Sequence, residues 1–196
     1  MPHLPVVIIL AAGRGERFIA SGGKTHKLQA LLAGKRVLDH VLDAVRASGL
    51  PHHVVESDAA RPGMGDSIAA GVKATPDAPG WLVLPADLPL IGSDTLRSIA
   101  LAATAAVTVP LYLGQRGHPV HFAAACAQEL LNLKGNQGAA QVIRGYAAMN
   151  SVVYVPVDDI GTLTDIDTLD DLYRAEKLLA QRQGPASQPN IKTPPV

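Results

Sequence analysis

The segment Val6-Val7-Ile8-Ile9-Leu10-Ala11-Ala12-Gly13-Arg14-Gly15-Glu16-Arg17-Phe18 predicts both a fold class and a ligand site. Its first five residues are apolar and mostly β-branched, which is typical of a parallel strand buried on both faces. From Ala11 to Gly15 the side chains are mostly small, so backbone N–H groups can approach phosphate oxygens. The guanidinium groups of Arg14 and Arg17 suit the same oxygens. The simpler alternative is an ordinary strand-to-helix turn.

The glycine spacing matches neither of two common phosphate-binding loops. The dinucleotide fingerprint G-x-G-x-x-G fails because Phe18 stands where the third glycine is required. Gly23-Lys24-Thr25 resembles the end of a Walker loop, but the earlier glycine of that loop would again fall on Phe18. We therefore expect a nucleotide-binding loop of another kind.

The composition is that of a globular protein with no overall charge. The 196 residues fit one domain, and they are 47% hydrophobic and 17% charged. Because 17 Lys and Arg balance 17 Asp and Glu, we expect no nucleic acid and no membrane as partner. No apolar run approaches the roughly 20 residues of a membrane span. Met1-Pro2-His3 also lacks the basic start of a signal peptide, so we expect a cytoplasmic protein.

Buried strands alternate with helical patterns along the chain. This order predicts a single α/β domain over residues 1–183, with three layers and a doubly wound, mostly parallel sheet. Later strands are expected at 54–55, 81–84, 107–110, 112–114, 119–122 and 152–155. One helix is expected around Val37 to Val45, with Gly49 as C-cap, and another from Asp66 or Ser67, either of which could cap it, to about residue 74. Further helices are expected at 93–105 with Ser93 as cap, at 123–132, at 137–148, and up to residue 183 with Thr168 as cap. We expect residues 19–26 to form a flexible polar insert and the tail 184–196 to be disordered.

Asp87 is the most informative carboxylate, because it follows the apolar strand at 81–84. Pro85 and Pro89 stiffen the backbone on either side of it. In a doubly wound sheet, ligands bind beyond the carboxyl ends of the strands, where the glycine loop also lies. A cation that bridges nucleotide phosphates, such as Mg²⁺, needs one or two protein carboxylates. Asp87 is therefore a candidate metal ligand, and the alternative is that it caps a turn.

A second acidic segment, Thr164-Asp165-Ile166-Asp167-Thr168, precedes the last expected helix. Asp165 and Asp167 would share one face of an extended segment. One of them could complete the metal site, while the other, with Thr168, holds the start of the helix. Pure helix capping is the alternative. We interpret two further acidic pairs as solvated charges: Asp158-Asp159 and Asp170-Asp171.

Short motifs follow one another in a characteristic order. They are Leu10-Ala11-Ala12-Gly13-x-Gly15-x-Arg17, Lys27-Leu28 with Gly34, Gly63-Met64-Gly65-x-Ser67, Pro85-Ala86-Asp87-Leu88-Pro89, Arg116-Gly117-His118-Pro119 and Asp165-Ile166-Asp167-Thr168. This set resembles the small nucleotidyltransferases that complete the molybdenum cofactor, the molybdopterin cytidylyl- and guanylyltransferases. It spans residues 6 to 180, whereas the first motif alone is shared with sugar-nucleotide transferases.

The resemblance implies a Rossmann-like nucleotidyltransferase fold and a reaction at the α-phosphate of a nucleoside triphosphate. It assigns catalytic roles to Lys27, Arg17 and Asp87, with Mg²⁺ held by Asp87 and, as second ligand, Asp167. It assigns nucleotide binding to Leu10, Ala11, Ala12, Gly13, Arg14, Gly15, Lys27, Gly63, Met64, Gly65, Ser67 and Asp87. Gly63 to Ser67 would line the base and ribose.

Ala12 favours CTP, because guanylyl relatives have a second glycine at this position. The sequence also departs from the family pattern in three places. Phe18-Ile19 replaces Met-Gly, the insert 20–26 is additional, and Gly15 is more typical of sugar-nucleotide enzymes. The insert leaves Lys24 as an alternative to Lys27 for the phosphate-binding lysine, and we choose Lys27 because Leu28 and Gly34 keep the family's register.

The reaction implied is attack by the terminal phosphate of molybdopterin on the α-phosphorus of CTP, with release of pyrophosphate. A molybdoenzyme could receive the product, and residues 115–122 are the expected acceptor side. An alternative enzyme on this scaffold is a nucleotidyltransferase acting on a sugar 1-phosphate or another phosphate. A catalytically silent nucleotide-binding protein that serves a molybdoenzyme is a further alternative.

Overall fold

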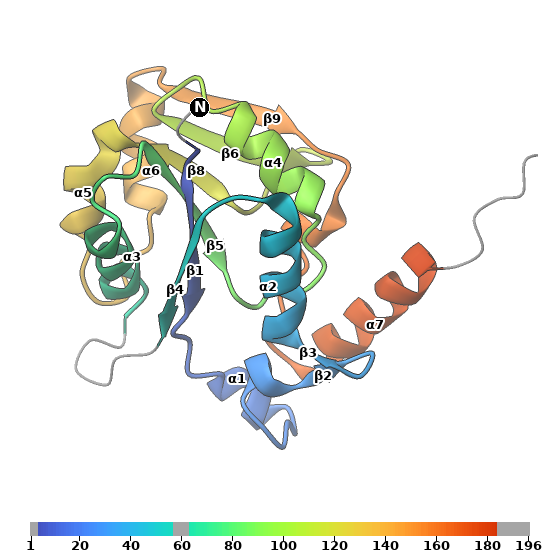
Figure 1. The fold of residues 1–196 in the computed structure, drawn as a ribbon. Coiled ribbons are helices and arrows are strands. Elements are labelled where there is room, and N and C mark those ends of the chain that lie inside the picture. Colours follow the sequence, from blue (N-terminus) through green and yellow to red (C-terminus); the bar gives the residue numbers. More distant parts are fainter. Residues whose placement is uncertain (1–3, 57–62, 184–196) are drawn as a thin grey trace, which may run out of the picture.

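The computed structural model describes residues 4–56 and 63–183, so the expected tail 184–196 lies outside the described residues. A seven-stranded mixed sheet forms its centre (Figure 1). The strand order is β4 (His52–Glu56), β1 (Val6–Ala11), β5 (Gly80–Pro85), β8 (Val120–Ala123), β6 (Val107–Tyr112) and β7 (Gln115–Arg116), and β9 (Val152–Pro156) also pairs with β6. β1 is parallel to β4 and β5, and β6 is parallel to β9. The strands β8 and β7 run the opposite way.

Helices cover both faces of this sheet (Figure 1). One layer consists of α3 (Met64–Ala74), α5 (Ala127–Leu131) and α6 (Ala140–Ala148), and the other of α2 (Val37–Ser48), α4 (Ser93–Leu101) and α7 (Leu169–Gln183). Ile8 of β1 packs with the first layer, while Val7 and Ile9 pack with the second. Because both faces are buried, β1 carries no polar residue. The predicted three-layer α/β domain with a mostly parallel sheet is confirmed.

Several predicted helix ends were wrong. Helix α4 begins at Ser93, but its N-cap is Gly92, and it ends at Leu101 rather than at residue 105. Helix α3 begins before Asp66 and Ser67, at Met64, with Gly63 as N-cap. The expected helix 123–132 is a 3₁₀ turn, η2 (Ala124–Cys126), followed by α5.

Thr168 caps α7, as predicted, and Asp171 shares in the cap. The backbone N–H of Asp171 donates to Oγ1 of Thr168 at 3.2 Å, and the N–H of Thr168 donates to Oδ2 of Asp171 at 2.9 Å. This reciprocal pairing is a capping box. The interpretation of Asp171 as a solvated charge was therefore wrong, because it satisfies backbone donors at the helix start.

Residues 16–29 have definite packing partners instead of forming a flexible insert. Phe18 in α1 (Glu16–Ala20) is fully buried, and a Cβ added to Gly23 would lie 2.3 Å from its ring. The hydroxyl of Ser21 donates to the Phe18 carbonyl at 2.8 Å and accepts from the N–H of Leu169 at 3.0 Å. The segment thus joins the glycine loop to the start of α7.

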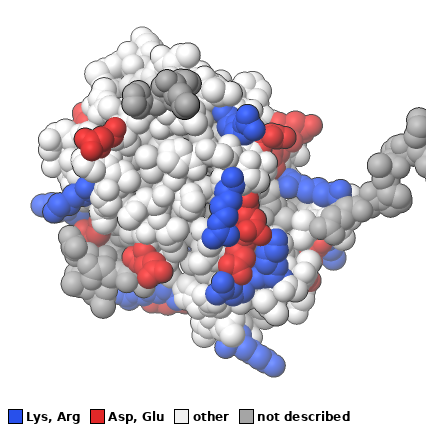
Figure 2. All heavy atoms as spheres, viewed as in Figure 1, with Lys and Arg blue, Asp and Glu red and all other residues white. Residues whose placement is uncertain are grey.

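A short hairpin and a 3₁₀ turn connect this segment to α2. The 3₁₀ turn η1 (Lys27–Gln29) is followed by β2 (Leu31–Leu32) and β3 (Lys35–Arg36). Over α2, Lys and Arg side chains lie next to Asp and Glu (Figure 2). Lys35 and Arg46 pair there with Asp43 at 2.8 and 3.2 Å. Such exposed pairs contribute little to stability.

Asp159 is buried, which corrects its interpretation as a solvated charge. Its carboxylate accepts from the N–H of Gly92 at 2.8 Å, the hydroxyl of Thr95 at 2.7 Å, and the N–H of Gly161 at 2.9 Å. Arg182 near the end of α7 donates to it at 2.7 Å. One carboxylate therefore joins α4, the turn η3 (Ile160–Thr162) and α7. Among the described residues, no helix is both long and apolar enough to cross a membrane.

Candidate active site

A cavity of about 790 Å³ lies at the carboxyl ends of β1 and β5. The glycine loop 12–15 forms one wall, and residues 85–88 after β5 form another. The start of α3 and the segment 162–167 complete the lining. Doubly wound sheets bind their ligands at this edge, because the loops that follow the parallel strands meet there.

Two cationic and two acidic side chains meet in this cavity. The Nζ of Lys27 lies 2.5 Å from Oδ2 of Asp87 and 2.8 Å from Oδ1 of Asp167. Nη2 of Arg17 lies 2.7 Å from the other oxygen of Asp167. The side chains of Lys27, Asp87 and Asp167 are 10%, 18% and 17% exposed, so these charges are poorly screened by solvent. We call these four residues the charge cluster.

Lys27 stays charged within the cluster. Burial alone would lower the pKa of Lys27, but the Asp87 and Asp167 carboxylates outweigh burial and raise its pKa above the usual value. The ammonium therefore stays positive near neutral pH, and together with the guanidinium of Arg17 it balances the two carboxylates. Lys24, the alternative lysine, is exposed and does not line the cavity.

Backbone hydrogen bonds hold the two carboxylates in register. The N–H of Ala86 donates to the carbonyl of Leu10 at 3.1 Å, which fixes the loop after β5 against β1. The N–H of Ile166 donates to the carbonyl of Asp87 at 2.9 Å. Because Asp167 follows Ile166 directly, its carboxylate is brought beside that of Asp87.

His26 clamps the glycine loop, and sequence reasoning missed it. Its Nδ1 accepts from the N–H of Leu28 at 3.3 Å, so the ring proton belongs on Nε2. Nε2 then donates to the carbonyl of Gly13 at 2.6 Å. Gly15 has φ +67°, and a Cβ there would lie 3.2 Å from the His26 ring, so the clamp requires glycine at this position. No spacing rule marks such a histidine in advance.

Most of the residues assigned to the site line the cavity. They are Leu10, Ala12, Gly13, Arg14, Gly15, Arg17, Lys27, Gly63, Met64, Ser67, Asp87 and Asp167. Ala11 and Gly65 do not line it. Ala11 is the last residue of β1 and pairs with β4, so its backbone belongs to the sheet.

The glycines of the Gly-Met-Gly motif have a packing function. A Cβ on Gly63 would lie 2.0 Å from the carbonyl oxygen of Gly135, and one on Gly65 would lie 2.6 Å from that of Gln137. The N–H of Gly65 also donates to the Gly135 carbonyl at 2.8 Å. The hydroxyl of Ser67 donates to the Gly63 carbonyl at 3.0 Å, which leaves its oxygen only as an acceptor toward the cavity.

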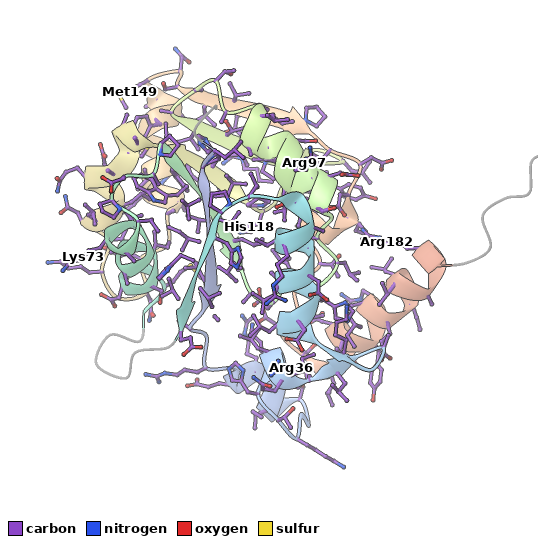
Figure 3. The ribbon with its side chains drawn as sticks, in the orientation of Figure 1. Arg36, Lys73, Arg97, His118, Met149 and Arg182 are labelled. Atoms are coloured by element: carbon purple, nitrogen blue, oxygen red, sulfur yellow. The ribbon has the colours of Figure 1, made fainter. Side chains whose placement is uncertain are left out.

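The cavity is also lined by residues that were not assigned to it singly: Arg116, His118, Asn136, Thr162 and Leu163. Asp165, the alternative to Asp167 as second metal ligand, lines it too. His118 is labelled near the middle of the view in Figure 3, and burial lowers its pKa, so its ring is neutral near pH 7. Its Nδ1 is buried and has no partner among the described residues. The guanidinium of Arg116 lies 5.1 Å from the centre of the Tyr154 ring. The motif that contains both residues gave the only signal for them.

The carboxylates fit a divalent cation that arrives with phosphate ligands. Oδ1 of Asp87 is buried without a hydrogen-bond partner in the part of the chain that the structure describes. An unsatisfied carboxylate oxygen of this kind is suited to a cation. Within residues 4–56 and 63–183, no group of three or more His, Cys, Asp or Glu could hold a metal. Mg²⁺ commonly takes one or two carboxylates and completes its shell with water and phosphate.

Asp165 also lines the cavity, on the same segment as Asp167. Partial desolvation and, after it, the neighbouring Asp167 carboxylate raise the pKa of Asp165. Asp167 pairs with two cations, whereas Asp165 forms no ion pair within the described residues. Asp167 therefore shares the Lys27 ammonium with Asp87, whereas Asp165 lines the same cavity without a cationic partner within the described residues.

Comparisons with known proteins show which family and which solved structures the chain is similar to. The family model of the MobA-like NTP transferase domain matches residues 7–152. The chain is 28% identical over 198 aligned positions to the purine catabolism protein PucB of Bacillus subtilis, with 85% of this chain and 93% of PucB covered. Rv0371c of Mycobacterium tuberculosis, also solved with manganese, superposes with a TM-score of 0.74 at 24% identity, covering 90% of this chain and 99% of Rv0371c. The nucleotidyl transferase Mth528 of Methanothermobacter superposes at 0.77 with 20% identity, covering 91% and 99%.

Proposed function

The chain belongs to the MobA-like NTP transferase domain family, and on this premise we propose that it transfers CMP from CTP to the terminal phosphate of molybdopterin, with release of pyrophosphate. The observation that carries the proposal is the charge cluster. Lys27, Arg17, Asp87 and Asp167 line the same cavity as the glycine loop, and we infer that the backbone N–H groups of this loop bind the phosphates.

In this reaction an oxygen of the acceptor phosphate forms a bond to the α-phosphorus of CTP. The bond between the α-phosphorus and the bridging oxygen breaks, and that oxygen leaves with pyrophosphate. A phosphate monoester is already ionised near neutral pH, so no side chain has to remove a proton from it. This agrees with a cavity that offers cations and carboxylates rather than an activated nucleophile.

Lys27 and Arg17 would neutralise the negative charge that builds up on the phosphates, and the clamped glycine loop would align them. Asp87 and Asp167 would hold Mg²⁺, which polarises phosphoryl oxygens when it is bound. The manganese complex of Rv0371c supports a divalent metal in a structural neighbour and leaves the choice between Mg²⁺ and Mn²⁺ to experiment.

Two lines support the choice of substrates. Ala12 lines the cavity at the position where the resemblance separates cytidylyl from guanylyl enzymes. The whole set of motifs, including Arg116 and His118 on the proposed acceptor side, matches the molybdopterin enzymes rather than sugar-nucleotide enzymes.

The test is metal-dependent release of pyrophosphate. CTP and GTP are compared as donors, and molybdopterin and sugar 1-phosphates as acceptors, with Mg²⁺, Mn²⁺ or a chelator. We expect release with CTP and molybdopterin only, its abolition by chelator, and its loss in Asp87→Asn. Asp94→Asn, on the exposed first turn of α4, is the matched control and should be fully active. Nucleotide binding without release under any condition would support the silent accessory protein instead.

A further inference from the structure

Lys27 stands between the two carboxylates that the proposed function assigns to the metal. Its ammonium contacts Oδ2 of Asp87 and Oδ1 of Asp167, while Arg17 takes the remaining oxygen of Asp167. Three of the four carboxylate oxygens thus contact Lys27 or Arg17, and the fourth, Oδ1 of Asp87, is buried without a hydrogen-bond partner within the described residues. The cluster is therefore charge-balanced without any metal.

We propose that Lys27 is a place-holding cation, which keeps free divalent metal off Asp87 and Asp167 until the polyphosphate of a nucleotide draws the ammonium away. The cavity then accepts the metal as its complex with a nucleoside triphosphate and not as the free ion. This inference rests on the proposed function, because it takes the phosphates to bind at the glycine loop.

The exclusion of free metal follows from charge and burial. Lys27 is buried, and its ammonium lies 2.5 Å from Oδ2 of Asp87 and 2.8 Å from Oδ1 of Asp167. A second cation placed among the same oxygens meets the repulsion of the ammonium at short range, where solvent screening is weak. It also has to break two ion pairs of Lys27 to gain full use of the carboxylates.

The release of Lys27 by nucleotide follows from where its side chain lies. A Cβ added to Gly13 would be 3.9 Å from Cε of Lys27, so the lysine stem borders the glycine loop. A triphosphate on that loop offers oxygens within reach of a flexible four-carbon stem. By linkage, a ligand that removes Lys27 from the carboxylates raises their affinity for metal, and bound metal raises affinity for that ligand.

The test measures Mn²⁺ binding without nucleotide, by the loss of the free-ion electron paramagnetic resonance signal. We expect Lys27→Gln, which removes the charge, to bind Mn²⁺ at least about tenfold more tightly than the wild type. Lys27→Arg keeps the charge and should bind as weakly as the wild type. The double variant Lys27→Gln with Asp87→Asn should lose the gain, which locates the added binding at this carboxylate. Equal gains in Mn²⁺ affinity in Lys27→Gln and Lys27→Arg, or no gain in either variant, would overturn the proposal.

A measurement on the wild type covers the case in which a lysine variant does not fold. The ammonium signal of Lys27 is followed by nuclear magnetic resonance in ¹⁵N-lysine protein. Mg²⁺ alone should leave it unchanged, whereas Mg²⁺ with CTP should shift it. A shift with Mg²⁺ alone would contradict the proposal.

The two proposals fail in different ways. If wild-type protein releases pyrophosphate from CTP while Lys27→Gln gains no metal affinity, only the place-holding role is wrong. If Lys27→Gln gains Mn²⁺ affinity as described, but the wild-type protein turns over no nucleotide with any acceptor, only the proposed reaction is wrong.

Discussion

The ammonium nitrogen of Lys27 lies 2.8 Å from Oδ1 of Asp167, although 140 positions separate the two residues in the chain. Asp167 reaches this place because the segment before α7 is tied to the backbone of Asp87, at the end of β5. The site therefore closes only when the last part of the domain has packed onto the first. A change in Asp167 should consequently report on catalysis and on the docking of this segment together.

The first prediction concerns Asp167→Asn. This change keeps the side-chain shape but removes the charge that Lys27 and Arg17 face, so we expect kcat for pyrophosphate release to fall by roughly 10²-fold. Steady-state kinetics with CTP check this, and thermal unfolding shows that the fold is kept. Asp170→Asn, at an exposed position of the same helix start, is the control and should leave kcat unchanged. An active Asp167→Asn enzyme would remove this carboxylate from the reaction.

The second prediction separates the two hydrogen bonds of His26. In His26→Ala both the clamp on Gly13 and the cap on Leu28 are lost, so we expect KM for CTP to rise roughly tenfold and the free energy of unfolding to fall by about 1–2 kcal/mol. In His26→Asn the shorter side chain can still cap Leu28 but cannot reach Gly13. We therefore expect Asn to restore stability without restoring KM. His52→Ala, at an exposed position of β4, should change neither quantity, and full recovery of KM in the Asn variant would contradict the clamp.

The third prediction concerns two glycines in helices. Gly65→Ala would place a Cβ 2.6 Å from the carbonyl oxygen of Gln137, a backbone atom that cannot swing aside. We expect the free energy of unfolding to fall by about 2 kcal/mol or more. A Cβ on Gly145 in α6 would meet nothing within 4 Å. Gly145→Ala should therefore raise the free energy of unfolding by about 0.5–1 kcal/mol. Chemical denaturation measures the free energy of unfolding of both variants. Equal changes in the two variants would show that the close packing of Gly65 is unimportant for stability.

Much of the fold could be predicted because its signals are local. The apolar run of β1 indicates that both faces of this strand are buried. In the structure Val7 packs against one helix layer and Ile8 against the other. The order of strands and helices then indicates a doubly wound sheet. The reversed strand β8, inserted between β5 and β6, could not be read in this way, because strand direction depends on pairing between distant segments.

The candidate site was predictable where a residue type has few other uses. Asp87 between prolines and Lys27 in its motif carried enough signal to be placed in one cavity, and the structure brings them into contact. Asp159 was misread because acidic pairs are usually solvated. Only the fold shows that its carboxylate accepts a hydrogen bond from the N–H of Gly92. His26 was missed because its two hydrogen bonds depend on the exact turn around it.

The fourth prediction concerns pH. Burial lowers the pKa of His121 on β8 from 6.5 to about 4. Between these values the unfolded chain binds more protons than the folded one, so stability is complete above pH 6.5 and is lost as pH falls toward 4. We expect His121 to account for up to roughly 3 kcal/mol of this loss. His121→Gln should flatten the pH dependence of the free energy of unfolding between pH 4.5 and 6.5, measured with urea. The exposed His52→Gln should leave it unchanged, and equal slopes in wild type and His121→Gln would disprove the assignment.

The last prediction concerns the anchor of α7. Asp159 accepts hydrogen bonds from two backbone N–H groups as well as from Arg182, so Asp159→Ala leaves buried donors unsatisfied. We expect its free energy of unfolding to fall by roughly 3 kcal/mol. Arg182→Ala should cost only about 1 kcal/mol, because the carboxylate keeps its other partners. Arg174→Ala breaks an exposed ion pair of the same helix at 3.3 Å and is the control, with an expected loss below about 0.5 kcal/mol. Denaturant unfolding ranks the three variants, and an Arg182→Ala loss as large as that of Asp159→Ala would mean that the ion pair, not the backbone donors, holds α7 in place.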